Sequence, residues 1–159
     1  MKKSILILNN KFIKKDILEK LKKKFLVIEK NIHSRNELKK YLLILKKKEI
    51  KISYIFASLG IYYDNYLFNL TKPNLKYFVT PTTGLDHINL KHLSKLNIKL
   101  IYLSQFPKFL NSISSTAEHT WAIIMALSRK LIPANNDVIL KQNLNREKFQ
   151  CKEIKNKNL

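Results

Sequence analysis

Glycine is scarce in this 159-residue sequence: only Gly60 and Gly84 are present, 24 positions apart. A G-x-G-x-x-G dinucleotide-binding loop and a P-loop both need closely spaced glycines, because their backbone must approach the phosphates. Both loops are therefore excluded within this sequence. The G-x-S-x-G and H-E-x-x-H motifs are also absent, and no two of the four histidines stand at i and i+4.

Cysteine and long apolar runs are equally scarce. Cys151 is the only cysteine, which excludes an internal disulfide and a cysteine-based zinc site. The longest apolar run, residues 121–127, is far short of the ~20 residues of a membrane-spanning helix. The apolar stretch at residues 5–8 is shorter than the about 7–15 residues of a signal peptide. We therefore expect a cytoplasmic protein with one folded domain, no membrane partner and no metal site.

Acidic residues are also few, at 11 Asp and Glu against 31 Lys and Arg, so the formal net charge is +20. Such a charge attracts phosphate backbones. However, the basic residues are nearly all lysines spread along the chain, whereas phosphate and guanine recognition favours arginine forks. The composition therefore favours a solvated surface, and binding of nucleic acid or another polyanion is the less favoured alternative.

Five short apolar runs predict buried strands that alternate with helices. They cover residues 3–8, 25–29, 52–57, 75–80 and 98–103. Alternating strands and helices predict an α/β fold, with a flavodoxin-like, five-stranded parallel sheet and helices on both faces. Ligands of such sheets lie beyond the carboxyl ends of the strands. Residues 58–60, 82–86 and 104–115 follow strands three, four and five, so we expect them to share one rim.

Capping signals place three helices. Ser34 and Glu37 form a capping box, and Asn89 is a candidate N-cap for a helix at 90–96. Ser115 with Glu118 predicts the start of a long helix at 115–131, which Pro133 is expected to stop. A weaker helical pattern continues to about residue 144.

Candidate chemical groups in the chain each have a structural alternative. Glu118 and His119 are adjacent on a helix and point about 100° apart, which favours structural roles for both. Asp86 and His87 lie in the rim loop, where the aspartate is expected to bond backbone amides of a turn. Cys151 is expected to be inert.

The segment 82–85, Thr-Thr-Gly-Leu, is the most informative of these candidates. Gly84 supplies either a positive φ or a close backbone approach at the end of a strand. The successive amides of this segment are suited to a concave site for a carboxylate. An ordinary tight turn explains the same residues equally well, so both readings stay open.

Four segments resemble the D-isomer-specific 2-hydroxyacid dehydrogenases. Residues 73–90, PNLKYFVTPTTGLDHINL, are similar to that family's "PNLK…G-x-D-[NH]-I-D-L" segment. Residues 97–102 resemble its "G-I-x-V-x-N" strand, and residues 111–129 resemble the "S-V-A-E-H-…-L-A-L-x-R" helix that links its two domains. Residues 153–159 are similar to the "E-L-x-G-K-T-L" segment before its cofactor domain. The sequence departs at Asn89 and Asn156, where the family usually has Asp and Gly.

The resemblance implies three segments: a flavodoxin-like substrate domain at 1–110, interdomain hinge helices at 111–145, and a polar tail at 146–159. The tail leads toward a cofactor domain that is absent from this chain. That domain carries the family's glycine fingerprint and its catalytic arginine, glutamate and histidine. No catalytic role is therefore carried onto a residue present here. The implied cofactor is NAD, with NADP not excluded.

The resemblance does assign binding roles to residues at the rim of the sheet and in the hinge motif. Thr83, Gly84 and Leu85 match the loop whose amides meet the substrate carboxylate, and Ser58 matches a residue that borders the substrate. Thr83 and Thr116 match positions near the cofactor, and His119 faces the domain junction in the hinge motif.

Three functional hypotheses follow. The first is the substrate-domain portion of an NAD-dependent oxidoreductase that acts on the CH–OH group of 2-hydroxy acids. The second is a non-catalytic remnant or interaction module that keeps the fold, and the third is polyanion binding. The sequence leaves the oligomeric state, the substrate and any activity in isolation undetermined.

We expect the 159-residue chain to have no dehydrogenase activity by itself. Hydride transfer requires the nicotinamide to be held at near-attack distance from the substrate, and the sequence has no glycine-rich loop to hold a dinucleotide. The purified chain, mixed with NADH and a panel of 2-oxo acids, should leave the NADH absorbance unchanged. Measurable NADH oxidation would refute this expectation.

Overall fold

The computed structural model describes residues 2–142 and 145–156. The chain divides into two compact units, Met1–Pro107 and Lys108–Leu159, and each is described by itself. The predicted boundaries at residues 110 and 145 stay predictions. Within the described residues, no helix combines the length and the apolar character needed to cross a membrane.

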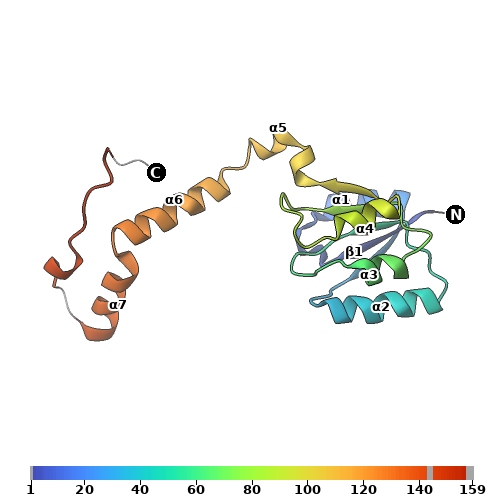
Figure 1. The fold of residues 1–159 in the computed structure, drawn as a ribbon, viewed down its shortest axis with the longest axis horizontal. Helices are drawn as coiled ribbons and strands as arrows, with labels where there is room; N and C mark the ends of the chain where they lie inside the picture. Colours follow the sequence, from blue (N-terminus) through green and yellow to red (C-terminus); the bar gives the residue numbers. More distant parts are fainter. Residues whose placement is uncertain (1, 143–144, 157–159) are drawn as a thin grey trace. The chain divides into compact units, whose positions relative to one another are not determined.

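The first unit is built on a five-stranded parallel sheet (Figure 1). All strand pairs are parallel, and the order β2-β1-β3-β4-β5 is that of flavodoxin-like sheets. The predicted fold is confirmed, with each strand beginning one or two residues later than the apolar run indicated. The strands are β1 (Ser4–Leu8), β2 (Leu26–Lys30), β3 (Tyr54–Phe56), β4 (Tyr77–Thr80) and β5 (Lys99–Tyr102).

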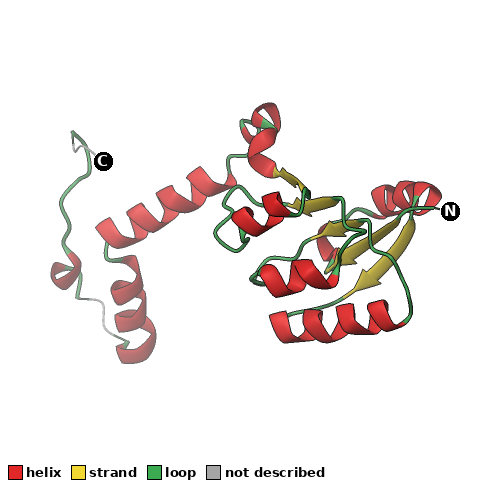
Figure 2. Cartoon of the chain, turned by 45° about the vertical axis from the view of Figure 1, so that its right-hand side comes forward, coloured by secondary structure: helices red, strands yellow, loops and turns green. Residues whose placement is uncertain are grey.

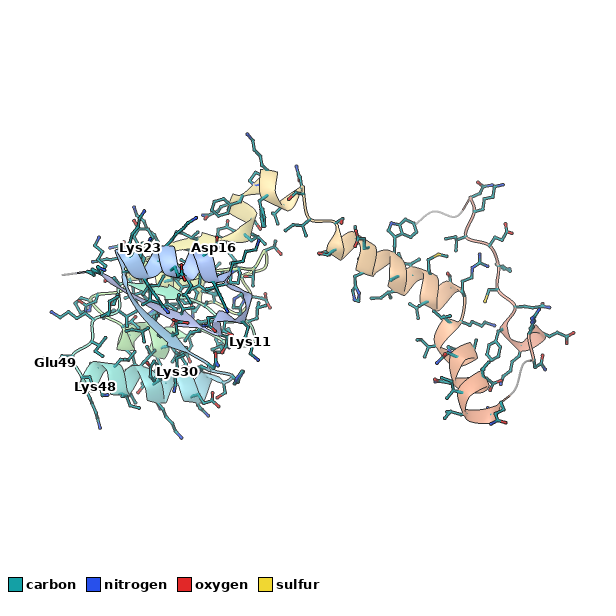
Figure 3. All side chains as sticks on the ribbon, turned by 180° about the vertical axis from the view of Figure 1, so that it is seen from behind. Lys11, Asp16, Lys23, Lys30, Lys48 and Glu49 are labelled. Carbon is teal, nitrogen blue, oxygen red and sulfur yellow. The ribbon has the colours of Figure 1, made fainter. Side chains whose placement is uncertain are left out.

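Helices cover both faces of this sheet, as predicted. In Figure 1 the helices α2, α3 and α4 lie on the near side of the strands, and the view from behind in Figure 3 has α1 in front. Helix α3 packs between α2 and α4. The helical segments of this unit are η1 (Asn10–Phe12), α1 (Lys15–Lys24), α2 (Arg35–Lys47), α3 (Asn65–Leu70), α4 (Leu90–Lys95) and η2 (Leu103–Gln105).

The hydrophobic core lies between the sheet and helices α2 to α4. Phe78 of β4 is fully buried there, with its ring 4.8 Å from that of Tyr63 and 5.3 Å from that of Phe68. Successive strand residues point to opposite faces of a sheet, so Tyr54 and Tyr77 lie on the α1 side. Their rings stack there at 5.2 Å. The apolar runs are thus apolar on both faces because both faces are packed.

Two of the predicted caps are confirmed. The Ser34 hydroxyl accepts a hydrogen bond from the Glu37 N–H at 3.2 Å, and Asn89 Oδ1 accepts from the His92 N–H at 3.1 Å. The Glu37 carboxylate accepts from the His33 N–H at 2.9 Å, one residue before the position that a capping box predicts.

Helix α5 (Pro107–Leu110) begins at the last residue of the first unit, and the second unit continues with α6 (Ser115–Ser128), α7 (Leu131–Lys141) and η3 (Glu147–Phe149). The predicted helix at 115–131 is wrong at its end: α6 ends at Ser128. Lys130 takes a left-handed φ of 49°, which interrupts the helical backbone between α6 and α7. Pro133 does not stop a helix. It lies in the first turn of α7, where its missing N–H removes no helical hydrogen bond.

Two other predictions concern the start of α6 and the helical pattern that continues to about residue 144. The predicted Ser115–Glu118 capping box is wrong: the N-cap is Ser114, whose hydroxyl donates to the Glu118 carboxylate. The weaker helical pattern corresponds to α7, which ends at Lys141, and residues 143–144 lie outside the described residues.

An ion-pair cluster joins α7 to η3. Asp137 is the one buried residue among those described in the second unit, and its carboxylate lies 3.1 Å from the ammonium groups of both Lys141 and Lys148. Hydrogen bonds from Lys141 and then from Lys148 lower the pKa of Asp137 below its ordinary value.

Candidate functional site

The candidate site lies at the carboxyl edge of the sheet, where the loops that follow β1, β3 and β4 meet (Figure 2, loops in green). In a parallel sheet all these loops leave from the same edge. The hydrogen bonds described below confirm that residues from the three loops contact one another.

The loop after β4 has its backbone carbonyls directed to protein donors. The Thr82 carbonyl accepts from the Leu103 N–H at 3.0 Å, and the Leu85 carbonyl accepts from the Ile88 N–H at 3.0 Å. The Thr82 hydroxyl donates to the Gly84 carbonyl at 2.8 Å, and the Ser104 hydroxyl donates to the Thr83 carbonyl at 3.3 Å. All four carbonyls of residues 82–85 are therefore occupied.

The N–H groups of residues 83–85, unlike the carbonyls, have no hydrogen-bond partner in the described protein. Within the described residues, the N–H groups of Thr83, Gly84 and Leu85 donate to no protein acceptor. Thr83 and Gly84 are exposed, and Leu85 is partly exposed. Three consecutive donors at the surface suit the oxygens of a carboxylate, which is an acceptor-only group.

Of the two roles expected of Gly84, the structure contradicts one. Its φ is not in the left-handed region, so the positive-φ reading is wrong; Gly60, with a φ of 81°, is the glycine that needs it. A Cβ placed on Gly84 would lie 3.3 Å from Asp86 Oδ1, which is a tight contact. This contact is with the free end of an exposed side chain, so it does not by itself require glycine, and the close-approach role stays a prediction.

Ser58, a predicted substrate-binding residue, lies in a dense network of protein hydrogen bonds. Its hydroxyl accepts from Asn9 Nδ2 at 2.6 Å and donates to the Leu59 carbonyl at 3.1 Å. Its N–H donates to the Tyr63 phenol oxygen at 3.0 Å, and its carbonyl accepts from the same phenol at 3.2 Å. Every polar group of Ser58 thus has a protein partner.

Asn9 connects three loops of the edge and was missed by the sequence reasoning. Besides bonding Ser58, its side chain donates to the Ile32 carbonyl at 2.6 Å and accepts from the Ile32 N–H at 2.8 Å. Its backbone is left-handed, with a φ of 57°, a conformation that asparagine tolerates better than most residues. The Asn9-Asn10 pair that ends the first strand was the available signal.

Tyr63 is the second residue that the sequence reasoning missed. Burial raises the pKa of its phenol, while the hydrogen bond with the Ser58 backbone lowers it. The phenol therefore remains protonated at neutral pH and keeps donating to Ser58. The backbone of Tyr63 also binds the loop after β4, because its N–H donates to the His87 carbonyl at 2.8 Å and its carbonyl accepts from the Asn89 N–H at 3.0 Å.

A chain of side-chain contacts holds the loop after β4 from within. His87 Nε2 lies 3.4 Å from the Thr80 hydroxyl, which is 2.9 Å from the Thr82 hydroxyl that bonds Gly84. Asp86 does not form the predicted turn bonds: its side chain is exposed, and its nearest described polar partner is His87 Nδ1 at 4.0 Å. The loop is thus fixed by its threonines rather than by Asp86.

Asp64 and Arg35 tie α3 to α2 at the same edge. Asp64 is the N-cap of α3, with Oδ1 accepting from the Leu67 N–H at 3.0 Å, and its Oδ2 accepts from the Arg35 guanidinium. Burial by itself raises the pKa of Asp64, but the Leu67 N–H and Arg35 outweigh it and hold that pKa below the ordinary 3.8.

The remaining predicted residues lie in the second unit. Thr116 and His119 are exposed on α6, and the Thr116 carbonyl accepts from the Thr120 hydroxyl at 2.8 Å. The Cys151 thiol donates to the Phe149 carbonyl. No cluster of three metal-ligating side chains occurs among the described residues.

The first unit and the helices after it have the fold of known dehydrogenases. No protein-family model and no curated protein matches the sequence. D-lactate dehydrogenase from Aquifex aeolicus, solved with NAD and lactic acid, aligns with a TM-score of 0.72 at 19% identity over 94% of this chain and 41% of its own. A glyoxylate reductase from Paecilomyes thermophila aligns with a TM-score of 0.68 at 16% identity, over 89% and 43%.

The apo form of D-mandelate dehydrogenase from Rhodotorula graminis aligns with a TM-score of 0.66 at 17% identity, over 90% of this chain and 41% of its own. This chain therefore spans less than half the length of the solved structures it resembles. The TM-scores show a shared fold, and at these sequence identities the comparison establishes the fold alone.

Asn9 is expected to be a main determinant of stability at this edge. Asn9→Gly keeps the left-handed backbone but removes three hydrogen bonds, so the free energy of unfolding should fall by about 2–4 kcal/mol. Ser58→Ala removes part of the same network and should cost about 1 kcal/mol. Urea unfolding measures both. An Asn9→Gly variant as stable as the wild type would contradict the network.

The Arg35–Asp64 pair should make stability depend on pH. Asp64→Asn keeps an N-cap acceptor but removes the charge, so at pH 7 it should cost about 0.5–1 kcal/mol. Because the folded pKa of Asp64 is lowered, this contribution is present above the unfolded pKa and is lost as the pH falls through the folded pKa. Urea unfolding of both proteins at falling pH should show the difference closing; a constant difference would exclude the charge as its cause.

Proposed function

We propose that this chain is the substrate-binding part of a D-isomer-specific 2-hydroxyacid dehydrogenase. The four sequence segments that resemble this family support the proposal, and so does the fold shared with solved dehydrogenases and a reductase. The intact enzyme would transfer a hydride between a nicotinamide and the C2 atom of a 2-oxo or 2-hydroxy acid, in the cytoplasm.

The loop after β4 is the proposed binding site for the acid. The observation that carries the proposal is the polarity of this loop: its carbonyls are occupied by protein donors, while the N–H groups of Thr83, Gly84 and Leu85 have no acceptor within the described residues. We propose that these amides donate to the substrate carboxylate. The Ser58 network supports the neighbouring loop, so Ser58 borders the substrate as a positioning residue.

The cofactor proposed for the intact enzyme is NAD or NADP, which would supply the hydride acceptor. The family resemblance supports Thr83, and separately Thr116, as residues near its nicotinamide end. The hydroxyls of Thr83 and Thr116 form no hydrogen bond within the described residues, so each is free to contact the nicotinamide end. The sequence offers no glycine loop for the pyrophosphate.

Selective labelling gives a direct test of the binding loop, because the chain has only two glycines. In a [15N]glycine-labelled sample, pyruvate should shift the amide signal of Gly84 in a saturable manner, since a carboxylate oxygen accepting from an N–H deshields it. Gly60 lies in the loop after β3, at the same edge but away from the proposed carboxylate contact, so its signal should shift less than that of Gly84. Pyruvamide, which lacks the carboxylate charge, should leave the Gly84 signal nearly unchanged.

A matched pair of variants sharpens this test. Thr82→Val removes the hydroxyl that holds the Gly84 carbonyl and should weaken the pyruvate response about threefold or more, corresponding to the loss of one hydrogen bond. Thr71→Val, which removes a buried hydroxyl away from the loop, should not change it. Equal shifts of Gly60 and Gly84, or equal effects of pyruvate and pyruvamide, would contradict carboxylate binding at this loop.

A further inference from the structure

The amino-terminal edge of the sheet, opposite the candidate site, contains a cavity of about 810 Å³. It is formed by the segments that precede β1 and β3, the end of α2 and the turn after α3. A volume of this size falls in the range of small-molecule sites. We call it the lysine cavity, because its charged lining residues are Lys2, Lys3, Lys46, Lys51, Lys72 and Glu49.

The charge of this lining is strongly one-sided. Five ammonium groups and one carboxylate give a formal charge of +4 around one cavity. Glu49 forms no ion pair with a lysine within the described residues, so the carboxylate does not neutralise a neighbour there. Figure 3 labels Glu49 beside Lys48 at the end of α2.

Helix electrostatics explain only one of the five lysines. Cations are favourable in the last turn of a helix, and Lys46 lies in the last turn of α2. Lys2 and Lys3 precede β1, Lys51 precedes β3, and Lys72 lies in the turn after α3. These four come from three separate non-helical segments and are brought together by the fold.

The ammonium groups are available to a ligand. Lys2 donates only to the Lys22 carbonyl, at a long 3.5 Å. The ammonium groups of Lys3, Lys46, Lys51 and Lys72 form no hydrogen bond, ion pair or aromatic contact within the described part of the chain, and all four side chains are exposed. Several separated point charges suit an anion with more than one charged group, and lysine binds phosphate in this way.

The rest of the lining is apolar enough to contact an organic body. Leu26 is 54% exposed, and Ile50 and Leu70 are partly exposed at the same cavity. The buried hydroxyls of Ser4 and Thr71 are already donated to the carbonyls of Lys51 and Phe68. Their protons are therefore not offered to a ligand, and the lysines remain the main donors.

We propose that the lysine cavity binds an organic phosphate with at least two phosphoryl groups, such as a nucleoside di- or triphosphate. The lysines would hold the phosphates, and the apolar residues would contact the organic body. This site is separate from the loop after β4, so its occupation does not depend on the function proposed for that loop.

Calorimetric titration of the full chain with ATP and with inorganic tripolyphosphate tests the proposal, at physiological salt and without divalent cations. ATP should bind more tightly than tripolyphosphate, because only ATP has a body for the apolar lining. The triple variant Lys46→Ala, Lys51→Ala, Lys72→Ala should weaken ATP binding about tenfold or more, through loss of three charge-assisted contacts.

A second triple variant controls for the overall charge of the protein. Lys15→Ala, Lys20→Ala and Lys40→Ala remove the same charge from exposed positions of α1 and α2 that do not line the cavity. This control should weaken ATP binding less than about threefold, because distant charges are screened by salt. Glu49→Gln should strengthen binding about twofold to threefold, by removing the one negative charge of the lining.

All variants change exposed residues, and their unfolding temperatures should match the wild type. Equal losses in the two triple variants would overturn the proposal in favour of general attraction to a +20 chain. Absence of ATP binding would overturn it as well. Tripolyphosphate binding as tight as that of ATP would overturn the assignment to an organic phosphate.

Discussion

The backbone of residues 82–85 is fixed from one side only, and the chemistry of the carboxyl edge depends on this asymmetry. Each carbonyl of this loop accepts a hydrogen bond from a hydroxyl or an amide of the protein. Two of those donors, Leu103 and Ser104, follow β5. The segment after β5 thus binds two of the carbonyls, and residues of the loop itself bind the other two. The N–H groups are the backbone groups left for a ligand, and an anion is the ligand that they favour.

The sequence predicts the sheet well because the strands are apolar on both faces, and such runs are recognisable without knowledge of their partners. It predicts the caps at Ser34 and Asn89 for a similar reason, since a cap depends on residues three positions apart. The Asn9 network could not be predicted in this way. It joins residues 23 and 49 positions apart, and its geometry depends on the left-handed backbone of Asn9.

Helix α6 shows where local signals mislead. Pro133 is a stop signal inside a helix and a favourable residue in a first turn, and the left-handed Lys130 decides between the two by starting a new helix. The same region contains large exposed apolar residues, including Trp121 at 49% and Leu127 at 74% exposure. A helix that is apolar around its circumference is typical of a buried element. The second unit thus has the composition of a helix pair that is covered on more than one side, in contrast to the first unit with its own core.

The two proposed anion sites, at opposite edges of the sheet, would depend on different physical means. Helices α1 and α2 run antiparallel to the strands, so their N-termini lie at the carboxyl edge and their C-termini lie at the opposite edge. Partial positive charges of the backbone therefore favour anions at the carboxyl edge, where we propose that the amides of residues 83–85 bind a carboxylate. At the opposite edge the helix ends carry partial negative charge. An anion can be held there only if full positive charges outweigh those ends, and the five lysines of the cavity supply them.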